Sequence, residues 1–354
     1  MTLVLAALPA AAQRERGGRG GPPPKLENGT YVERTFHSAG LERDDRYGVF
    51  LPKGYDAEGN DDRYPLIVWL HGMWEDHSRF FTRGGAPVLD RLLGSGEVPP
   101  LILVCADGGS NSFYINADSG SAYEDLITDD LLAEVEANFR VRPERAFRAL
   151  VGVSMGGYGA LKIAFRRPEL FGAITAHSAA ILPRKHQDLD KQFPWLQQWG
   201  GGQRALASIF GSPIDDERWD RENVLQIADQ LDPETLRGLK IYFDCGSADR
   251  MNLSGPNQDL HEVLERRKVP HTWELIEDGG HGWRTDYNQQ AVERSLRFLT
   301  RSWKVAEGTA GLQGVLDGSP GAAGKSDKKS DDTDGTGKQP ATGGTGDGKG
   351  GTRR

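Results

Sequence analysis

One serine in this chain stands in a setting that would make it a nucleophile. Ser154 is the centre of a Gly-x-Ser-x-Gly motif whose glycines are Gly152 and Gly156. An apolar, strand-like run precedes it and a helical pattern follows it. Such a turn exposes the hydroxyl and aims the N-terminal N–H groups of the helix at the reacting centre. We therefore predict that Ser154 is a catalytic nucleophile; the alternative is an ordinary glycine-rich turn with an incidental serine.

A serine hydroxyl needs a base, and the base needs an acidic residue that orients it. His281 lies in the glycine-flanked stretch EDGGHGW, after a strand-like run and before the last helical pattern. We predict that His281 is the base. The other histidines after Ser154 fit less well. His177 follows the serine too closely, and His186 lies in an insertion. His261 lies in a helical pattern, and His271 begins a strand.

The acid should follow the strand that comes before this histidine. The run IYFDCGSADRMN offers Asp244, still within the apolar stretch, and Asp249, in the loop after it. We prefer Asp249 and keep Asp244 as the alternative, since a carboxylate within the strand is more typical of a structural role. The acid would fix the imidazole tautomer and stabilise the imidazolium.

An acyl-transfer site also needs donors for the negatively charged oxygen of the tetrahedral intermediate. One donor should be the N–H of the residue after the nucleophile, which is Met155. The other should come from a loop after an earlier strand. The run VWLHGM ends such a strand, and Gly72 lets the chain turn, so we predict the Met73 N–H as the second donor.

The elements that would position these residues alternate along the chain. Five continuous apolar runs suit strands buried on both faces of a parallel sheet. Helical patterns lie between them, including residues 123–139, whose apolar side chains fall on roughly one face, and residues 287–303. The alternation predicts an α/β fold with a mostly parallel sheet, helices on both faces and its site at the carboxyl ends of the strands. The five runs are residues 64–72, 99–109, 147–154, 171–180 and 239–249.

One stretch, residues 182–235, breaks the alternation. It is too long for a simple loop, and it precedes the strand expected to carry the acid. We predict an insertion that folds over the sheet. Its aromatic residues would either line a substrate cleft or pack a small core of the insertion itself, and the sequence leaves both open for Phe193, Trp195, Trp199, Phe210 and Trp219.

The two ends of the chain differ from its middle in composition. Residues 1–12 form a short apolar segment that ends in alanines, which predicts a signal peptide remnant with cleavage after Ala12, although the basic start is missing. Residues 13–29 read as a Gly/Pro-rich linker and residues 305–354 as a disordered low-complexity tail. The folded domain should therefore span residues 30–304.

Composition excludes several other classes. A net charge of −8 gives no basic footprint for nucleic acid. No apolar run is long enough to predict a membrane span. Two cysteines, Cys105 and Cys245, form neither a disulfide framework nor a zinc cluster, and both should be buried thiols. The spacing of His71 and His77 with the acidic residues between them fits no common metal site, so we expect neither a metal nor a cofactor.

Taken together, the motifs resemble the esterase family of α/β-hydrolases, which includes S-formylglutathione hydrolase (esterase D), feruloyl and acetylxylan esterases, and the antigen 85 mycolyltransferases. The resemblance covers about residues 30–303 and is carried by LIVWLHG, ADGGSNSFYIN, GVSMGGYGALKIAFRRPELFG, FDCGSAD and GGHGW. It implies an α/β-hydrolase fold with Ser154, Asp249 and His281 as catalytic residues and Met73 and Met155 as oxyanion donors. It further implies that Glu124 braces the site from outside; the alternative is a plain helix N-terminal carboxylate.

The function expected from these features is hydrolysis of a carboxylic ester through an acyl-enzyme, without a cofactor. The possible signal and the aromatic insertion favour an exported enzyme, periplasmic or extracellular, acting on an acetyl or feruloyl carbohydrate ester. The alternatives are a cytoplasmic S-formylglutathione-type thioesterase, an acyltransferase of the mycolyltransferase type and a non-catalytic binding protein. The oligomeric state and the identity of the acyl group stay open.

Overall fold

The computed structural model describes residues 25–117, 120–281 and 286–316. The predicted signal segment, most of the linker and the tail beyond residue 316 lie outside the described residues. The chain divides into two compact units, Met1–Ala310 and Gly311–Arg354. Of the second unit, the structure describes only the last residues of a helix that ends at Leu316.

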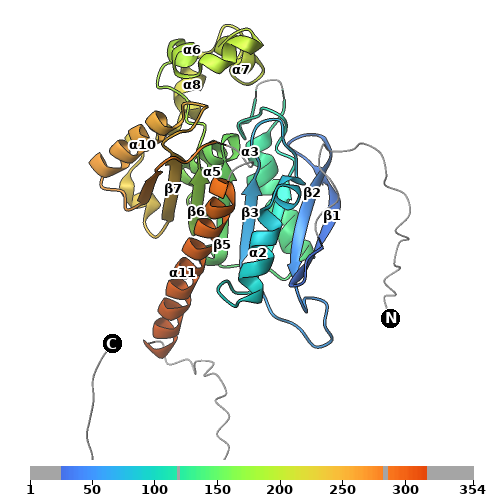
Figure 1. Cartoon of the computed structure of the whole chain (residues 1–354). Coiled ribbons are helices and arrows are strands. Elements are labelled where there is room, and N and C mark those ends of the chain that lie inside the picture. The colour runs from blue at the N-terminus through green and yellow to red at the C-terminus, as the bar shows by residue number, and fades with distance from the viewer. Residues whose placement is uncertain (1–24, 118–119, 282–285, 317–354) are drawn as a thin grey trace, which may run out of the picture. The chain divides into compact units, whose positions relative to one another are not determined.

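An eight-stranded sheet forms the centre of the first unit (Figure 1). The strand order is β1-β2-β4-β3-β5-β6-β7-β8. The pairs β1–β2 and β2–β4 are antiparallel, and every other neighbouring pair is parallel. The mostly parallel sheet predicted from the apolar runs is thus confirmed. The strands are β1 (Gly29–Ser38), β2 (Arg43–Pro52), β3 (Leu66–Leu70), β4 (Ile102–Ala106), β5 (Arg148–Val153), β6 (Ala173–His177), β7 (Lys240–Gly246) and β8 (Thr272–Ile276).

Strand burial follows the sequence pattern. The five continuous apolar runs became β3 to β7, and every residue of these strands is buried except Lys240 at the start of β7. Strand β8 lies at the edge of the sheet and exposes half of Leu275. Cys105 and Cys245 are buried free thiols, as predicted.

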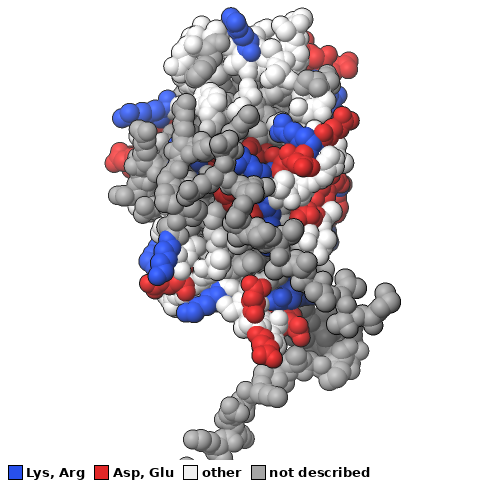
Figure 2. Space-filling model, turned by 90° about the vertical axis from the view of Figure 1, so that its right-hand side faces the viewer, with Lys and Arg blue, Asp and Glu red and all other residues white. Residues whose placement is uncertain are grey.

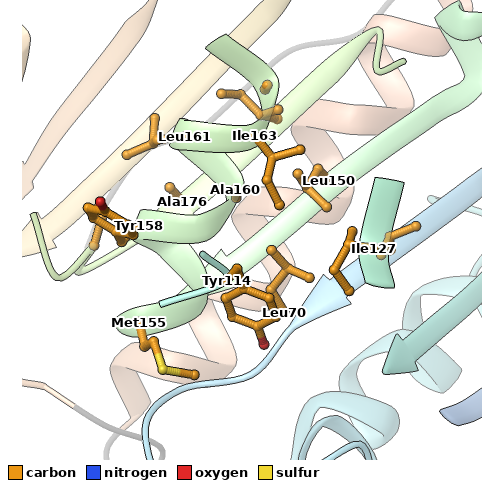
Figure 3. Packing of buried hydrophobic residues seen from close by; sticks show 14 of the residues in the cluster. Leu70, Tyr114, Ile127, Leu150, Met155, Tyr158, Ala160, Leu161, Ile163 and Ala176 are labelled. Atoms are coloured by element: carbon orange, nitrogen blue, oxygen red, sulfur yellow. The ribbon is translucent and has the colours of Figure 1, made fainter. Parts of the chain in front are cut away.

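Helices cover both faces of the sheet. On one face α2 (Gly85–Gly94) and α11 (Asp286–Leu316) bury apolar residues against the strands, and Figure 1 shows both in front of the sheet. On the other face pack α4 (Leu132–Asn138), α5 (Met155–Arg166), α9 (Val224–Gln230) and α10 (Ser254–Arg266). Figure 3 shows Ala160 and Ile163 of α5 beside Leu150 of β5, with Ile127 in the same group of packed side chains. Two apolar cores, one on each face, therefore hold the sheet in place.

The helix predicted over residues 123–139 is helical but not uniform. It begins as α3 (Tyr123–Asp125), widens into the π-helical turn η1 (Leu126–Leu131) and ends as α4. All six apolar residues placed on its inner face are buried: Leu126, Ile127, Leu131, Leu132, Val135 and Phe139. The wider turn keeps them on the buried side, so hydrophobic spacing could not distinguish it from an α-helix.

The last helix is longer than predicted, since α11 continues past residue 304 to Leu316. Val292, Leu296, Leu299 and Trp303 anchor its first half in the core. Once a helix is anchored, each further residue adds a hydrogen bond at little cost, and no proline interrupts residues 304–316. Among the described residues, no helix is long and apolar enough to cross a membrane.

The predicted insertion lies between β6 and β7, and its described regular elements are helices joined by short loops. In Figure 1, α6, α7 and α8 gather beyond one end of the strands. The aromatic residues divide between the two expected roles: Phe210 and Trp219 pack against each other at a tilted angle within the insertion, while Phe193 and Trp195 line a cavity. The side chain of Trp199 lies outside the described residues. The helices are η3 (His186–Asp188), α6 (Leu189–Gln192), η4 (Pro194–Trp199), α7 (Gly202–Phe210), α8 (Asp216–Glu222), α9 and η5 (Pro233–Leu236).

Candidate active site

Ser154 occupies a strained turn between β5 and α5. Its backbone has φ 56° and ψ −117°, a conformation that non-glycine residues rarely adopt. The neighbouring glycines are required by close backbone approach: a Cβ on Gly152 would lie 2.1 Å from the carbonyl oxygen of Gly156, and a Cβ on Gly156 would lie 2.0 Å from that of Leu70. The motif is therefore a turn that only glycine permits, with the serine at its apex.

The backbone of Ser154 is held by the next strand and by its own helix. Its N–H donates to the carbonyl of His177 at 2.9 Å. Its carbonyl accepts hydrogen bonds from the N–H groups of Tyr158 (3.0 Å) and Ala180 (2.9 Å). These bonds hold the turn in its strained conformation, as pre-organisation of a reactive residue requires.

Asp249 and His281 are in hydrogen-bond contact. The Nδ1 of His281 lies 2.9 Å from Oδ2 of Asp249. Because an ionised carboxylate only accepts, the neutral imidazole carries its proton on Nδ1 and leaves a lone pair on Nε2. The Asp249 side chain is fully buried, and that of His281 is 17% exposed. The pair thus has the arrangement of an oriented general base.

The loop after β7 orients the carboxylate of Asp249. Its Oδ1 accepts the N–H of Met251 at 2.8 Å, and its Oδ2 also faces the Cys245 thiol at 3.6 Å. The alternative acid, Asp244, is bonded elsewhere: its carboxylate contacts His177 and the Tyr242 hydroxyl. Only Asp249 is in contact with His281, as the preference for the loop residue required.

Met73 lies in a tight turn after β3. The Gly72 N–H donates to Oε2 of Glu75 at 3.0 Å. We expected Gly72 to let the chain turn. In the structure the left-handed backbone of this turn is at Trp74, which has a φ of 59°. A Cβ on Gly72 would lie 3.6 Å from the Cβ of Ser154, so the turn packs directly against the serine.

Two backbone N–H groups are available as oxyanion donors. The N–H of Trp74 is bonded to the carbonyl of Ser110 and that of Gly72 to Glu75, but no acceptor for the Met73 N–H lies among the described residues. Met155 is the first residue of α5, so its N–H has no acceptor within the helix. In the described part of the chain, the N–H groups of both predicted donors are therefore without a hydrogen-bond acceptor and lie on either side of Ser154.

These residues meet at one edge of the sheet. Met73, Ser154, Asp249 and His281 all follow parallel strands, β3, β5, β7 and β8, at their carboxyl ends. Ser154, His281 and Met73 line one cavity of about 1030 Å³. No direct hydrogen bond joins Ser154 and His281 in the described part of the chain. The structure thus brings Asp249 and His281 into contact and places Ser154 and His281 at the same cavity.

The cavity has one apolar wall and one charged wall. The apolar wall comes mainly from the insertion: Leu182, Phe193, Trp195, Leu196 and Leu206, with Phe113, Met251 and Leu253 from other segments. The Trp195 indole N–H donates to the carbonyl of Met251 at 3.3 Å, which ties the insertion to the loop of Asp249. The apolar lining of the cavity and the loop of Asp249 are therefore joined by a hydrogen bond.

The charged wall was not predicted. Glu75 lies between Arg79 (3.5 Å) and Arg83 (3.0 Å), and all three line the cavity. Asp76 lies beside them. Burial raises the pKa of its carboxyl, but hydrogen bonds from Ser78 lower that pKa by more, so the net shift is downward. The sequence does indicate the ion pair between Glu75 and Arg79, since residues four apart on a helical turn lie close together. It could not show that Glu75 also binds the turn beside the serine.

Glu124 lies outside the cavity wall, behind the nucleophile helix. Its carboxylate is 2.6 Å from the Nζ of Lys162, a fully buried residue of α5. Glu222 of α8 completes the cluster, 3.1 Å from Lys162 and 2.9 Å from Arg166. On the face shown in Figure 2, by contrast, acidic and basic side chains are interspersed at the surface. Glu124 is thus placed to hold α5 through Lys162, and its effect on the reaction remains a prediction.

The geometry can now be set beside known proteins. Residues 38–298 match the profile of a family described as "Putative esterase", which spans well over half of the chain. The chain belongs to this esterase family. Residues 38–298 are therefore called the esterase domain, after the family.

Relatives of this esterase domain carry related names. The endo-1,4-beta-xylanase/feruloyl esterase of Xylanibacter ruminicola is 31% identical over 153 residues, which are 42% of this chain and 21% of the relative. The acetyl esterase of Caldicellulosiruptor saccharolyticus is 25% identical over 276 residues, 76% of this chain and 98% of the relative. The chain thus spans only about a fifth of the length of the first.

A solved ferulic acid esterase shares the fold of the esterase domain. It has 28% sequence identity and a TM-score of 0.65, and the likeness covers 78% of this chain and all of that one. The α/β-hydrolase fold implied by the sequence motifs is thereby confirmed. The roles of the individual site residues rest on the geometry above.

Proposed function

We propose that this chain hydrolyses carboxylic esters through an acyl-enzyme on Ser154. The observation that carries the proposal is the meeting of a strained, glycine-flanked serine with an Asp249–His281 pair at one cavity. Residue types alone would be weak support, but the shared strand edge and the available backbone donors supply the other parts that acyl transfer needs.

In the first half of the reaction, Ser154 Oγ attacks the ester carbonyl carbon while its proton passes to Nε2 of His281. Asp249 holds the imidazole by Nδ1 and stabilises the positive charge that develops. The N–H groups of Met73 and Met155 donate to the oxyanion. The carbon–oxygen bond to the alcohol then breaks, and His281 returns the proton to the leaving alkoxide. In the second half, water attacks the acyl carbon while its proton passes to Nε2 of His281. The bond between the acyl carbon and Ser154 Oγ then breaks, His281 returns the proton to Oγ, and the carboxylic acid is released.

We further propose that the preferred substrate is a carbohydrate ester of an aromatic acid of the feruloyl type. The apolar wall formed by Phe193, Trp195 and Phe113 offers flat surfaces to an aromatic acyl group. A cavity of about 1030 Å³ also exceeds what an acetyl group would fill. Two of the similar proteins above are named as feruloyl or ferulic acid esterases. Because another relative is named an acetyl esterase, an acetyl ester is the second candidate.

The first experiment compares the wild type and Ser154→Ala on p-nitrophenyl acetate. We expect kcat/KM to fall by about 10⁴–10⁶-fold in the variant. Equal activity in both proteins would show that Ser154 is not the nucleophile. Inactivity of the wild type towards every ester tested would favour a non-catalytic binding protein.

A substrate panel then separates the remaining functions. Feruloylated and acetylated xylan fragments test the two carbohydrate esters, and S-formylglutathione tests the thioesterase alternative. Acyl transfer is tested by adding a sugar acceptor and measuring transferred against hydrolysed product. We expect the highest kcat/KM for the feruloyl ester; a higher value for the thioester would overturn the substrate proposal.

Trp195→Ala tests the aromatic contact. Removing a ring that packs on the acyl group should lower kcat/KM for a feruloyl ester by about 10-fold or more, because such contacts contribute about 1–3 kcal/mol. The matched control is the same variant on an acetyl ester, which should change little. Equal losses on both esters would mean that Trp195 acts through the Met251 loop instead.

Export belongs to the proposal as well. The support is the apolar segment at residues 1–12 and its alanine-rich end. In a Gram-negative host we expect a periplasmic protein whose first residue is Gln13. A protein that stays in the cytosol with residues 1–12 intact would contradict export.

A further inference from the structure

A cluster of two histidines and one glutamate lies away from the cavity, between α10 and β8. His261 and Glu265 are four residues apart on α10, and His271 directly precedes β8. One ligand atom of each residue lies within 4.8 Å of the other two. Nothing in the proposed reaction uses these side chains.

The two imidazoles are aligned before any ion is considered. His271 donates from Nδ1 to the carbonyl of Val269 at 2.8 Å, so its Nε2 carries a lone pair. That Nε2 lies 2.8 Å from Nδ1 of His261. An imidazole bonded through one nitrogen to a backbone carbonyl is the usual arrangement of a metal-binding histidine, because the bond fixes the tautomer and the ring orientation.

Aromatic stacking holds both rings in place. His271 stacks on Phe243 with ring centroids 5.7 Å apart, and His261 stacks on Trp273 at 6.3 Å. The His271 side chain is 1% exposed, whereas that of Glu265 is 66% exposed and 3.8 Å from Nε2 of His271. The cluster is therefore rigid on its imidazole side and open to solvent on its carboxylate side, which gives an ion a way in.

We propose that His261, Glu265 and His271 form a binding site for a zinc-class divalent ion. Two imidazoles and one carboxylate, with water as the fourth ligand, suit Zn²⁺ or Co²⁺. Nitrogen ligands of a tetrahedral ion with bonds of about 2.0–2.1 Å lie about 3.3 Å apart, so the two rings would separate by about half an ångström. The proton on Nδ1 of His261 moves to its Nε2, and both imidazoles bind as neutral ligands.

The ion would join α10 to β8 and would not act on the ester. His271 lies at the amino end of β8, and the proposed catalytic residues lie at the carboxyl ends of the strands. Asp249 precedes α10 in the chain and His281 follows β8. An ion at this place would therefore stabilise the segment that carries both residues, independently of the proposed reaction.

The test uses untagged, chelator-treated full-length protein and Co²⁺, whose visible absorption reports tetrahedral coordination. We expect one Co²⁺ per chain, displaced by Zn²⁺, and a rise in the thermal midpoint with Zn²⁺. His261→Gln and Glu265→Gln should weaken binding by at least the roughly 10–100-fold that loss of an outer-shell partner costs. Esterase activity should be the same with and without the ion.

The matched control is His37→Gln, which removes an exposed histidine that pairs with Asp44 on the β1–β2 hairpin. It should bind Co²⁺ like the wild type. Glu265→Gln changes an exposed side chain and should fold normally, so a loss of binding in this variant cannot be ascribed to unfolding. No tetrahedral Co²⁺ spectrum in the wild type, or unchanged affinity in both cluster variants, would overturn the proposal.

Discussion

In the part of the chain that the structure describes, two groups that each combine an aspartate, a histidine and a serine can be compared. The cavity set is Asp249, His281 and Ser154. The core set is Asp244, His177 and Ser295, in which His177 Nδ1 lies 3.0 Å from Asp244 and its Nε2 lies 2.5 Å from Ser295 Oγ. In both sets the aspartate contacts Nδ1 of the histidine, so the same residue types occur in closely similar pairs.

The two sets differ in surroundings. The core set is buried, with at most 1% of each residue exposed, and none of its residues lines the cavity. Ser295 lies within α11, where its hydroxyl also contacts Thr175 at 2.6 Å. Ser154 instead sits in a strained turn beside a cavity and at a helix N-terminus. Access, backbone strain and available backbone donors therefore distinguish the two sets, and the hydrogen-bonded residue types do not.

The largest predicted effect separates the two histidines. His281→Gln should lower kcat by about 10⁵–10⁶-fold, because the base is lost. His177→Gln should instead lower the free energy of unfolding by about 1–3 kcal/mol, since buried partners lose hydrogen bonds, and should leave kcat of the folded enzyme nearly unchanged. Ester hydrolysis and urea denaturation of both variants measure this. An inactive but folded His177→Gln protein would make the comparison wrong.

A smaller effect separates the two aspartates. Asp249→Asn should lower kcat by about 10⁴-fold, because the amide favours the wrong imidazole tautomer. Asp244→Asn should act on stability, since this carboxylate contacts His177, Tyr242 and Arg294 in the core. Steady-state kinetics and thermal unfolding test both. Equal losses of kcat would mean that the core set also shapes the active site.

A third buried cluster extends the comparison to charges. Lys162→Met should destabilise the fold by about 3–5 kcal/mol, because Glu124 and Glu222 would keep their buried charges and lose the buried cation between them, leaving the more exposed Arg166 and, for Glu222, Arg221. Lys304→Met, on the exposed side of α11, is the control and should change little. Urea denaturation measures both. A similar midpoint for the two variants would show that the cluster contributes nothing to stability.

The smallest effect concerns acid pH. Burial raises the pKa of Glu222, but Lys162 and Arg166 lower it by more, so its pKa in the folded protein is below the ordinary 4.5. Its stabilising contribution is therefore complete above about pH 4.5 and is lost as the pH falls through the folded-state pKa. Chemical denaturation between about pH 6 and pH 3 should show a shallower acid loss in Glu222→Gln than in the wild type. Parallel plots of the free energy of unfolding against pH for the two proteins would contradict a lowered pKa of Glu222 in the folded state.

Much of the site could be predicted because its signals are local. The bend at Ser154 is indicated by the two glycines of its motif, and Ser154, Asp249 and His281 follow the strands β5, β7 and β8 in chain order. His177 is rejected from the sequence because it follows the serine too closely, and Asp244 because it lies within an apolar run; the structure buries both residues. The strands were visible for the same reason, since burial on both faces leaves a continuous apolar run.

Other features depend on contacts that no local pattern contains. The sequence alone indicated a mostly parallel α/β sheet, the serine turn, an inserted segment and two buried thiols, because each follows from neighbouring residues. Only the tertiary structure decided that Glu75 binds the turn of Met73, that Trp195 faces the cavity while Trp219 packs inward, and that His261 meets His271. These outcomes depend on which segments pack together, and that choice is made by the summed burial of the whole core.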